Sequence, residues 1–490
     1  MTNQAASRSA LLTLLLLGAW GCAKKERIII FATGNSQGRI WAGEASGSGE
    51  KAGGFAVFKT LYDRETLPKL AVDTGNWFSA TREGWLSRGR STVACLNAVP
   101  YAAAAVGLED LSLSPKELQN LAETSSVPLL ASNLYLKTNK KPDYISSSEI
   151  TAAGGRKIGV FSLLIYSALA PNKPWHLANY KLEKESYEAQ KAIKTLRDGG
   201  AQLIVAILAV NPKEKTTQKF YRDLLSKLPR IDLVITDDPS VNKPFKADRA
   251  WVARAGLGMA SAARLELTLD AAGRMTDLSS DEIRLASGKY PEDPAMLKVV
   301  DGYRKASQAH FSKRVGFLDA PLPLKENGAY PAADFTADCM RRWARTDAAI
   351  IGLKEPAAGF PAGTVTVGDL YSTFPLDSSI VFVKIRGDDL ERALAGLQAE
   401  DISVSGLRLF LKDGILERVE SDKGPLVPGR VYKLAVPDSL VSGRENPLLS
   451  SAMEFSNSRR YLREVVGWCF SRQRSFSRPA GGRIVRSGDK

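Results

Sequence analysis

The first place in this chain where chemistry could be expected is a loop that directly follows an apolar run. Residues 28–40, IIIFATGNSQGRI, are typical of a buried strand that runs into a polar loop flanked by glycine. Enzymes built from alternating strands and helices commonly bind ligands at such strand ends. The loop contains no His, Asp or Glu, and Asn35 and Gln37 offer carbonyl oxygens without charge. We therefore expect this loop to hold no catalytic acid, base or imidazole ligand.

Histidine is scarce throughout the chain. Its 490 residues include two His, His176 and His310. Two histidines are too few to supply a metal centre built from several imidazole ligands. We interpret both histidines as surface or packing residues.

Carboxylates leave an alternative, because a cluster made only of oxygen ligands could bind a Ca²⁺- or Mg²⁺-like ion. The carboxylates that follow strand-like runs are Asp73, Glu109, Asp110, Asp237 and Asp238. The simpler interpretation is that Asp73 stabilises a turn and that the other four are solvated loop carboxylates.

The elements that would position these loops alternate between strand-like and helix-like stretches. Branched apolar runs predict strands at 27–33, 69–74, 157–164, 201–210 and 231–238. The stretch 183–200 predicts a helix that ends at Gly199–Gly200. Its apolar face would be formed by Tyr187, Ala189, Ala192, Ile193 and Leu196. This alternation predicts an α/β layered domain over residues 27–290.

A second domain is predicted beyond one connecting helix at 291–313. The pattern restarts with a helix near 334–345, further strands, and a helix that begins at Asp388–Asp389. We assign residues 314–470 to this α/β domain and 471–490 to a basic tail. The chain's formal charge is +14, but no groove of alternating basic and aromatic residues is visible, so we expect no nucleic-acid partner.

In order and spacing, these elements resemble the secreted 5′-nucleotidase family over nearly the whole mature chain. The residues that match family motifs are 32–39 (ATGNSQGR), 53–56 (GGFA), 73–78 (DTGNWF), Asn97, Tyr101, Gly107 and 127–134 (VPLLASNL). The resemblance implies an N-terminal four-layer αββα metallophosphoesterase-like domain, a linking helix and a C-terminal α/β domain of the 5′-nucleotidase type. It also implies a hydrolase family that acts in nucleotide catabolism with two metal ions.

The positions that would carry the family's chemistry hold other residue types. The family's metal-ligand positions correspond to Asn35, Gln37, Asn76, Leu108, Glu109, Asp110, Ala209, Val210, Asp238 and Ser240. The nucleoside-binding positions correspond to Gly352, Ala357, Leu376, Ser439 and Glu445. The second set lacks both stacking aromatic rings and the arginine fork. We therefore expect no metal pair, no cofactor and no nucleoside pocket; one oxygen-ligated divalent cation is the alternative.

The N-terminus predicts a lipoprotein signal peptide over residues 1–22. Arg8 precedes the apolar run ALLTLLLLGAW, and Gly21-Cys22 follows it. Ala19 and Gly21 suit a lipobox, whereas the bulky Trp20 is less usual. The prediction is a lipid attached at Cys22; an ordinary signal peptide with a coincidental cysteine is the alternative. Cys95, Cys339 and Cys469 are widely spaced, so at least one is expected to be a buried thiol.

Together these features predict a lipid-anchored protein of the bacterial cell envelope, facing the periplasm or the cell surface, with the outer membrane as the expected location. We expect it to be catalytically inactive and to serve as a binding or assembly scaffold, with an envelope protein as a possible partner class. The alternative is an active phosphoester hydrolase of the 5′-nucleotidase family with an altered metal site.

Overall fold

The computed structural model describes residues 26–44, 51–78, 81–165, 179–210, 216–398, 401–441, 446–472, 476–477, 479 and 481–486. Cys22, His176 and Glu445 lie outside these ranges. The chain divides into two compact units, one comprising Met1–Ala168 and Pro174–Asp301, the other Leu169–Lys173 and Gly302–Lys490. The division falls within α7 (Pro294–Phe311), in the region where the sequence predicts a connecting helix. No helix within the described ranges is long and apolar enough to cross a membrane.

The N-terminal unit contains two packed sheets. The first has the order β17-β16-β1-β4-β5-β6, and β15 pairs with β1. Its strands are β1 (Glu26–Gly34), β4 (Lys69–Asp73), β5 (Tyr101–Ala105), β6 (Leu129–Leu130), β15 (Gly256–Leu257), β16 (Ser261–Leu269) and β17 (Met275–Arg284). The second has the order β13-β14-β12-β11-β9-β8. Its strands are β8 (Ser148–Ala153), β9 (Arg156–Ile165), β11 (Leu203–Val210), β12 (Leu233–Thr236), β13 (Phe245–Ala247) and β14 (Ala250–Arg254).

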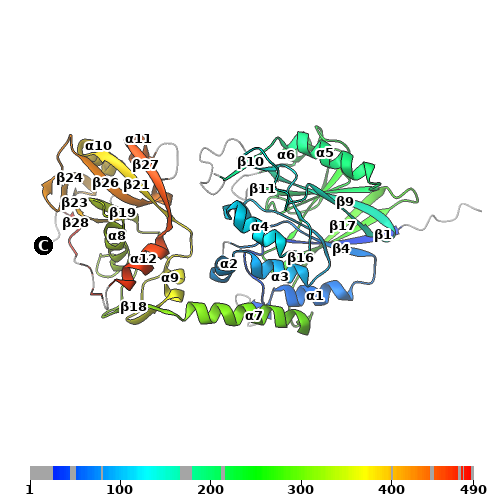
Figure 1. Ribbon diagram of the computed structural model, residues 1–490, viewed down its shortest axis with the longest axis horizontal. Coiled ribbons are helices and arrows are strands. Elements are labelled where there is room, and N and C mark those ends of the chain that lie inside the picture. The colour runs from blue at the N-terminus through cyan, green and yellow to red at the C-terminus, as the bar shows by residue number, and fades with distance from the viewer. Residues whose placement is uncertain are drawn as a thin grey trace, which may run out of the picture. The chain divides into compact units, whose positions relative to one another are not determined.

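Side chains alternate between the two faces of each sheet, and this alternation produces the four layers. One core lies between the sheets and includes Ile28, Ile30 and Val72 from the first and Val205 and Ile235 from the second. The intervening residues face outward, where helices cover them (Figure 1). Those helices are α1 (Phe55–Arg64) and α3 (Arg90–Asn97) beside the first sheet, and α5 (Glu185–Asp198) and α6 (Gln218–Leu225) beside the second. The predicted αββα architecture is confirmed.

The predicted helical face of α5 is mostly correct. Ala189, Ala192, Ile193 and Leu196 are buried, and the helix is capped at Gly199. Tyr187 was wrongly placed on that face, since it is 57% exposed. It lies in the first turn of α5, where its ring packs against the ammonium group of Lys191. An amphiphilic tyrosine can make that contact without burial.

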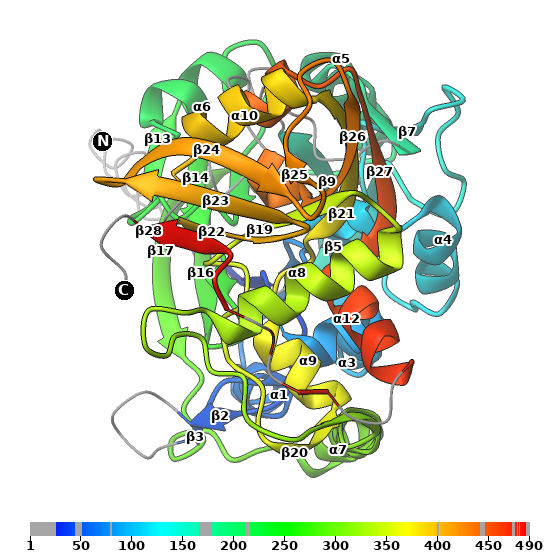
Figure 2. The same cartoon turned by 90° about the vertical axis from the view of Figure 1, so that its left-hand side faces the viewer.

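The C-terminal unit is built on a five-stranded sheet with the order β22-β19-β26-β21-β27. These strands are β19 (Ala348–Gly352), β21 (Ser379–Arg386), β22 (Ile402–Ser405), β26 (Val431–Pro437) and β27 (Glu454–Tyr461). A smaller sheet has the order β25-β24-β23-β28, from β23 (Leu407–Lys412), β24 (Ile415–Ser421), β25 (Gly424–Pro425) and β28 (Ile484–Arg486). Two apolar cores flank the larger sheet. Figure 2 shows this unit with α8 (Pro331–Ala344), α9 (Val367–Thr373), α10 (Gly387–Gly396) and α12 (Leu462–Ser471).

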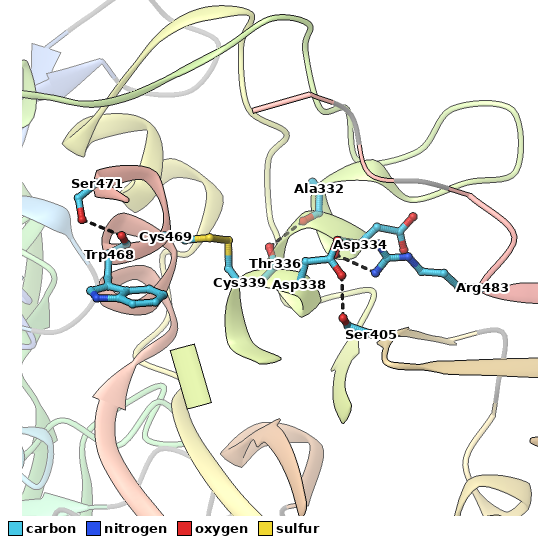
Figure 3. The surroundings of a disulfide bond; sticks show 10 residues. All are labelled: Ala332, Asp334, Thr336, Asp338, Cys339, Ser405, Trp468, Cys469, Ser471 and Arg483. Carbon is cyan, nitrogen blue, oxygen red and sulfur yellow. Dashed lines mark hydrogen bonds and ion pairs between the residues drawn. A yellow bond between two sulfur atoms is a disulfide. The ribbon is translucent and has the colours of Figure 1, made fainter. Parts of the chain in front are cut away.

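A disulfide joins α8 to α12 within one of these cores. Cys339 and Cys469 are 130 residues apart in the sequence, and their Cα atoms lie 5.6 Å apart (Figure 3). Both cysteines are buried. The remaining described cysteine, Cys95, is a buried free thiol, which agrees with the prediction that at least one cysteine stays unpaired.

Candidate functional site

Parallel pairing brings the polar loops of the N-terminal unit together at the carboxyl ends of the strands. β1, β4 and β5 run parallel in one sheet, and β11 and β12 run parallel in the other. Backbone hydrogen bonds from Asn35 N to Gly75 O (2.8 Å) and from Gln37 N to Asn76 O (3.0 Å) join the loops after β1 and β4. The positions identified from sequence therefore do converge.

The side chain of Asn76 lies at the point of convergence. Its Nδ2 donates to Oδ1 of Asn35 at 2.5 Å and to Oδ2 of Asp237 at 3.1 Å. Its Oδ1 accepts the backbone N–H of Glu109 at 2.9 Å. We call Asn35, Asn76, Glu109 and Asp237 the Asn76 centre. One neutral amide thus connects loops from both sheets with every one of its polar atoms bonded.

The backbone of these loops adopts a conformation that suits asparagine. Asn35, Gln37 and Asn76 have φ angles of 48°, 50° and 60°, which is the left-handed region. Asparagine tolerates that region better than most residues with a Cβ atom. Gln37 also donates from Nε2 to Glu109 at 3.3 Å, which extends the network toward the loop after β5.

Two buried aspartates hold the shape of these loops. Asp73 accepts the Thr33 hydroxyl (2.7 Å), the Gly75 N–H (2.9 Å) and Nε1–H of Trp77 (3.0 Å), so it does stabilise a turn. Asp110 accepts the N–H groups of Asn76, Trp77 and Gly107 at 2.8–2.9 Å. Burial raises the pKa of Asp73 to about 6 and that of Asp110 to about 7.

The interpretation of the other acids as solvated is wrong for three of the four. Asp110, Asp237 and Asp238 are 0%, 3% and 1% exposed, and Glu109 is half-buried. Asp237 accepts the Val210 N–H at 3.0 Å, and burial raises its pKa to about 7. They are buried because the two sheets close over the strand ends, which no local pattern in the sequence reveals.

Asp238 has a separate set of partners beside this centre. It accepts the Tyr221 hydroxyl at 2.7 Å, the Ser240 N–H at 2.8 Å and the Ser240 hydroxyl at 2.6 Å, as well as the Thr216 hydroxyl. Burial opposes ionisation, but these hydrogen bonds outweigh it and hold the pKa of Asp238 below its ordinary value. Its lone pairs are therefore engaged by donors from within the protein.

These residues do not fit a pair of divalent metal ions. The group directed between Asn35 and Asp237 is an NH₂ donor, whereas a metal needs lone pairs. Leu108, Ala209 and Val210 are buried aliphatic residues at other ligand positions. Among the described residues, no group of three or more His, Cys, Asp or Glu side chains is arranged to hold a metal ion. The side chains at these positions therefore support no catalytic step that needs two metal ions.

The nucleoside positions of the C-terminal unit are occupied by a different polar network. Glu355 accepts the hydroxyls of Ser378 (2.8 Å) and Ser439, which ties the loop after β19 to the segments before β21 and after β26. Leu376 is 70% exposed, and Ala357 is placed by a backbone bond from its N–H to Thr373 O at 2.8 Å. Gly352 is the last residue of β19.

Arg463 was not predicted from sequence, yet it determines where Leu376 lies. Its side chain is 4% exposed, donates to Phe374 O (3.1 Å) and Leu376 O (3.2 Å), and pairs with Asp377. The guanidinium also lies 4.5 Å from the ring centroid of Tyr371. One arginine on α12 gives no sequence signal for this contact, because its partners lie more than 80 residues earlier.

Comparisons with known proteins agree with this architecture. The family model for the 5′-nucleotidase C-terminal domain matches residues 310–451. Protein UshA of Yersinia enterocolitica is 20% identical over 85% of this chain and 86% of its own length. The solved 5′-nucleotidase precursor of Thermus thermophilus aligns with a TM-score of 0.61 at 18% identity, over 95% of this chain and 100% of its own.

A Staphylococcus aureus protein provisionally named a 5′-nucleotidase aligns with a TM-score of 0.71 at 12% identity, over 94% of this chain and 100% of its own. At identities this low, the alignments show a shared fold only. The chemistry of the site must be inferred from the residues present in this chain. Residues 310–451 thus match the 5′-nucleotidase C-terminal domain, and the chain shares its two-domain fold with solved 5′-nucleotidases, including a metallophosphoesterase-type fold in its N-terminal domain.

Proposed function

We propose that this protein is a non-catalytic member of the 5′-nucleotidase family. In this proposal it is a lipid-anchored scaffold of the bacterial cell envelope that binds or assembles with another envelope component. The observation that carries the proposal is the Asn76 amide, which donates to Asn35 and to Asp237 at once. A cation bridging acidic ligands would cross-link the same loops in a metalloenzyme. Here a hydrogen-bonded amide makes the cross-link.

Charge balance supports this proposal. Two divalent ions repel each other strongly, and several anionic ligands must offset that repulsion. A neutral residue at position 76 removes a negative charge next to Asp237. Burial raises the pKa of Asp237 to about 7, so this carboxyl is partly protonated at pH 7. The amide at position 76 and the partial protonation of Asp237 therefore lower the negative charge that a cation would otherwise offset.

Elemental analysis and enzyme assays test the inactive state. Protein purified without chelator should contain only substoichiometric transition metal. It should not hydrolyse AMP or p-nitrophenyl phosphate when Mn²⁺, Zn²⁺, Co²⁺ or Mg²⁺ is added. A stoichiometric pair of metal ions would contradict the proposal. So would metal-dependent turnover that the Asn76→Ala variant abolishes, and the chain would then be a hydrolase with an altered metal site.

Mass spectrometry of the membrane-extracted protein tests the anchor. The proposal expects a mature chain that begins at an acylated Cys22, and a Cys22→Ala variant that is released from the membrane fraction. A mature N-terminus beyond Cys22 would refute lipid anchoring. Cross-linking in cells, followed by identification of the joined peptides, would then name the partner that the scaffold serves.

A further inference from the structure

A cavity of about 690 Å³ lies in the N-terminal unit near the ends of β16 and β17. It is formed by the loop after β1, the hairpin of β2 (Gly43–Glu44) and β3 (Lys51–Ala52), the start of α1 and the turn between β15 and β16. An isolated bridge from Ala52 to Ala286 holds the hairpin beside the end of β17, as Figure 2 also shows. None of the residues of the Asn76 centre lines this cavity. We call it the arginine cavity.

Glycines let the backbones around the arginine cavity approach closely. Gly54 has a φ of 86°, and a Cβ atom there would lie 2.7 Å from the backbone of Trp41 and Ala42. A Cβ atom at Gly53 would lie 2.7 Å from Met259 O. Side chains at these positions would move the loops that carry Trp41 and Met259. The wall of the cavity is thus closely packed.

Two guanidinium groups of the arginine cavity lack a carboxylate partner. Within the described part of the chain, Arg39 donates to the neutral Oε1 of Gln37 at 3.2 Å, and Arg284 forms no ion pair. Nη1 of Arg39 lies 3.6 Å from where a Cβ atom of Gly258 would be, so this guanidinium lies over the glycine-containing β15–β16 turn.

The carboxylates that line the arginine cavity are paired elsewhere. Glu83 pairs with Arg82 at 2.8 Å, and Glu282 pairs with Arg254 at 2.8 Å while also accepting the Ser261 hydroxyl at 2.7 Å. The charges of Arg39 and Arg284 are therefore not offset by the acids of the same lining.

The rest of the lining is largely apolar and includes one large flat ring. Trp41 and Met259 contribute an indole and a thioether, and alanines and glycines supply most of the remaining surface. The volume falls within the usual range for small-molecule sites. Guanidinium groups bind planar oxyanions in a fork geometry, and an indole face favours flat apolar groups.

We propose that the arginine cavity binds a small organic oxyanion with a flat apolar body, held by Arg39 and Arg284 at its charged end and by Trp41 along its body. This site shares no lining residue with the Asn76 centre, and the proposal does not depend on whether the protein is catalytic. It gives the N-terminal domain a ligand that the loss of a metal centre would not abolish.

Calorimetric titration of the full mature chain with 2-naphthalenesulfonate tests this site with a probe that phosphoesterases do not cleave. We expect saturable binding at one site, weaker binding of inorganic sulfate, which lacks the flat body, and weaker binding of 2-naphthalenemethanol, which lacks the charge. The Arg39→Gln and Arg284→Gln variants should each raise the Kd about tenfold or more, because a charge-assisted hydrogen bond is lost.

Arg249→Gln is the matched control, because Arg249 is exposed and lies in the turn between β13 and β14, on the other sheet. Its Kd should equal that of the unmodified protein, and the melting temperatures of all three variants should be unchanged. Equal weakening in the control would overturn the proposal by showing that net charge alone attracts the probe. The absence of saturable binding in the unmodified protein, or an unchanged Kd in both Arg39→Gln and Arg284→Gln, would also overturn it.

Discussion

Replacing Asn76 with aspartate would convert the amide donor of the Asn76 centre into a carboxylate that faces another carboxylate. Nδ2 of Asn76 lies 3.1 Å from Oδ2 of Asp237, so the substituted oxygen would occupy nearly the same place. Two unit charges at that distance repel by about 5 kcal/mol at an effective dielectric constant of about 20. The domain can avoid this repulsion by taking up a proton.

Proton uptake sets the expected magnitude and its pH dependence. An aspartate with an unfolded-state pKa of about 3.9 costs about 4 kcal/mol to keep protonated at pH 7, and about 1.5 kcal/mol at pH 5. The free energy of protonation at pH 7 is slightly smaller than the repulsion between two ionised carboxylates. Protonation therefore sets the upper limit of the loss in stability. The folded variant binds more protons than the unfolded one, and its stability therefore falls as pH rises. We expect Asn76→Asp to lose at most about 4 kcal/mol at pH 7 and at most about 1.5 kcal/mol at pH 5, because Asp237, with a pKa of about 7, already holds part of this proton in the unmodified protein.

Urea unfolding at both pH values, with hydrogen exchange of the β1 and β4 amides to report on the N-terminal unit, would measure these losses. Asn76→Ala is the control, since it removes the donor without adding charge and should cost about 1–3 kcal/mol with a smaller pH dependence. Added Mn²⁺ should stabilise Asn76→Asp and leave Asn76→Ala unchanged. If Asn76→Asp were as stable as the unmodified protein at pH 7 without metal, the amide would not bridge Asn35 and Asp237.

Three further predictions concern pH, the disulfide and nucleoside binding. The N-terminal unit should lose stability as pH rises from about 4 to 8. The reason is the raised pKa of Asp110, because the folded state retains a proton there that the unfolded state has released. Asp110→Asn should reduce this dependence of the melting temperature on pH in calorimetric melts. The double variant Cys339→Ala/Cys469→Ala should destabilise the C-terminal unit by about 3–5 kcal/mol, and reductant should then lower the melting temperature of the unmodified protein but not that of the variant. Calorimetric titration with adenosine or AMP should show no binding, and Ala357→Arg alone should not create it, because no aromatic ring stands at Leu376 or Ser439; micromolar affinity in the unmodified protein would contradict this interpretation of the pocket.

Local patterns in the sequence were sufficient to predict several of the buried strands and an α/β layered domain. The run 157–164 corresponds to β9 (Arg156–Ile165), and the run 201–210 to β11 (Leu203–Val210), because a strand buried on both faces is continuously apolar over its own length. The scarcity of histidine was likewise visible from composition alone and bears directly on the metal chemistry. Tyr187 was misplaced because helical periodicity predicts a face, whereas the neighbouring layer decides how wide the buried part of that face is.

Only the tertiary structure shows which contacts are made by the residues at the family's metal-ligand positions. Asn76 and Asp237 are 161 residues apart, and they meet because parallel strands in two packed sheets end at the same edge. Tertiary packing also buries Asp110, Asp237 and Asp238, although each follows a strand as an ordinary loop acid would. Burial raises the pKa values of Asp110 and Asp237, whereas the hydrogen bonds around Asp238 lower its pKa. The disulfide between α8 and α12 and the unpaired guanidinium groups of the arginine cavity depend equally on contacts between distant segments. A single sequence encodes short-range periodicity directly, whereas burial and charge pairing are properties of the assembled layers.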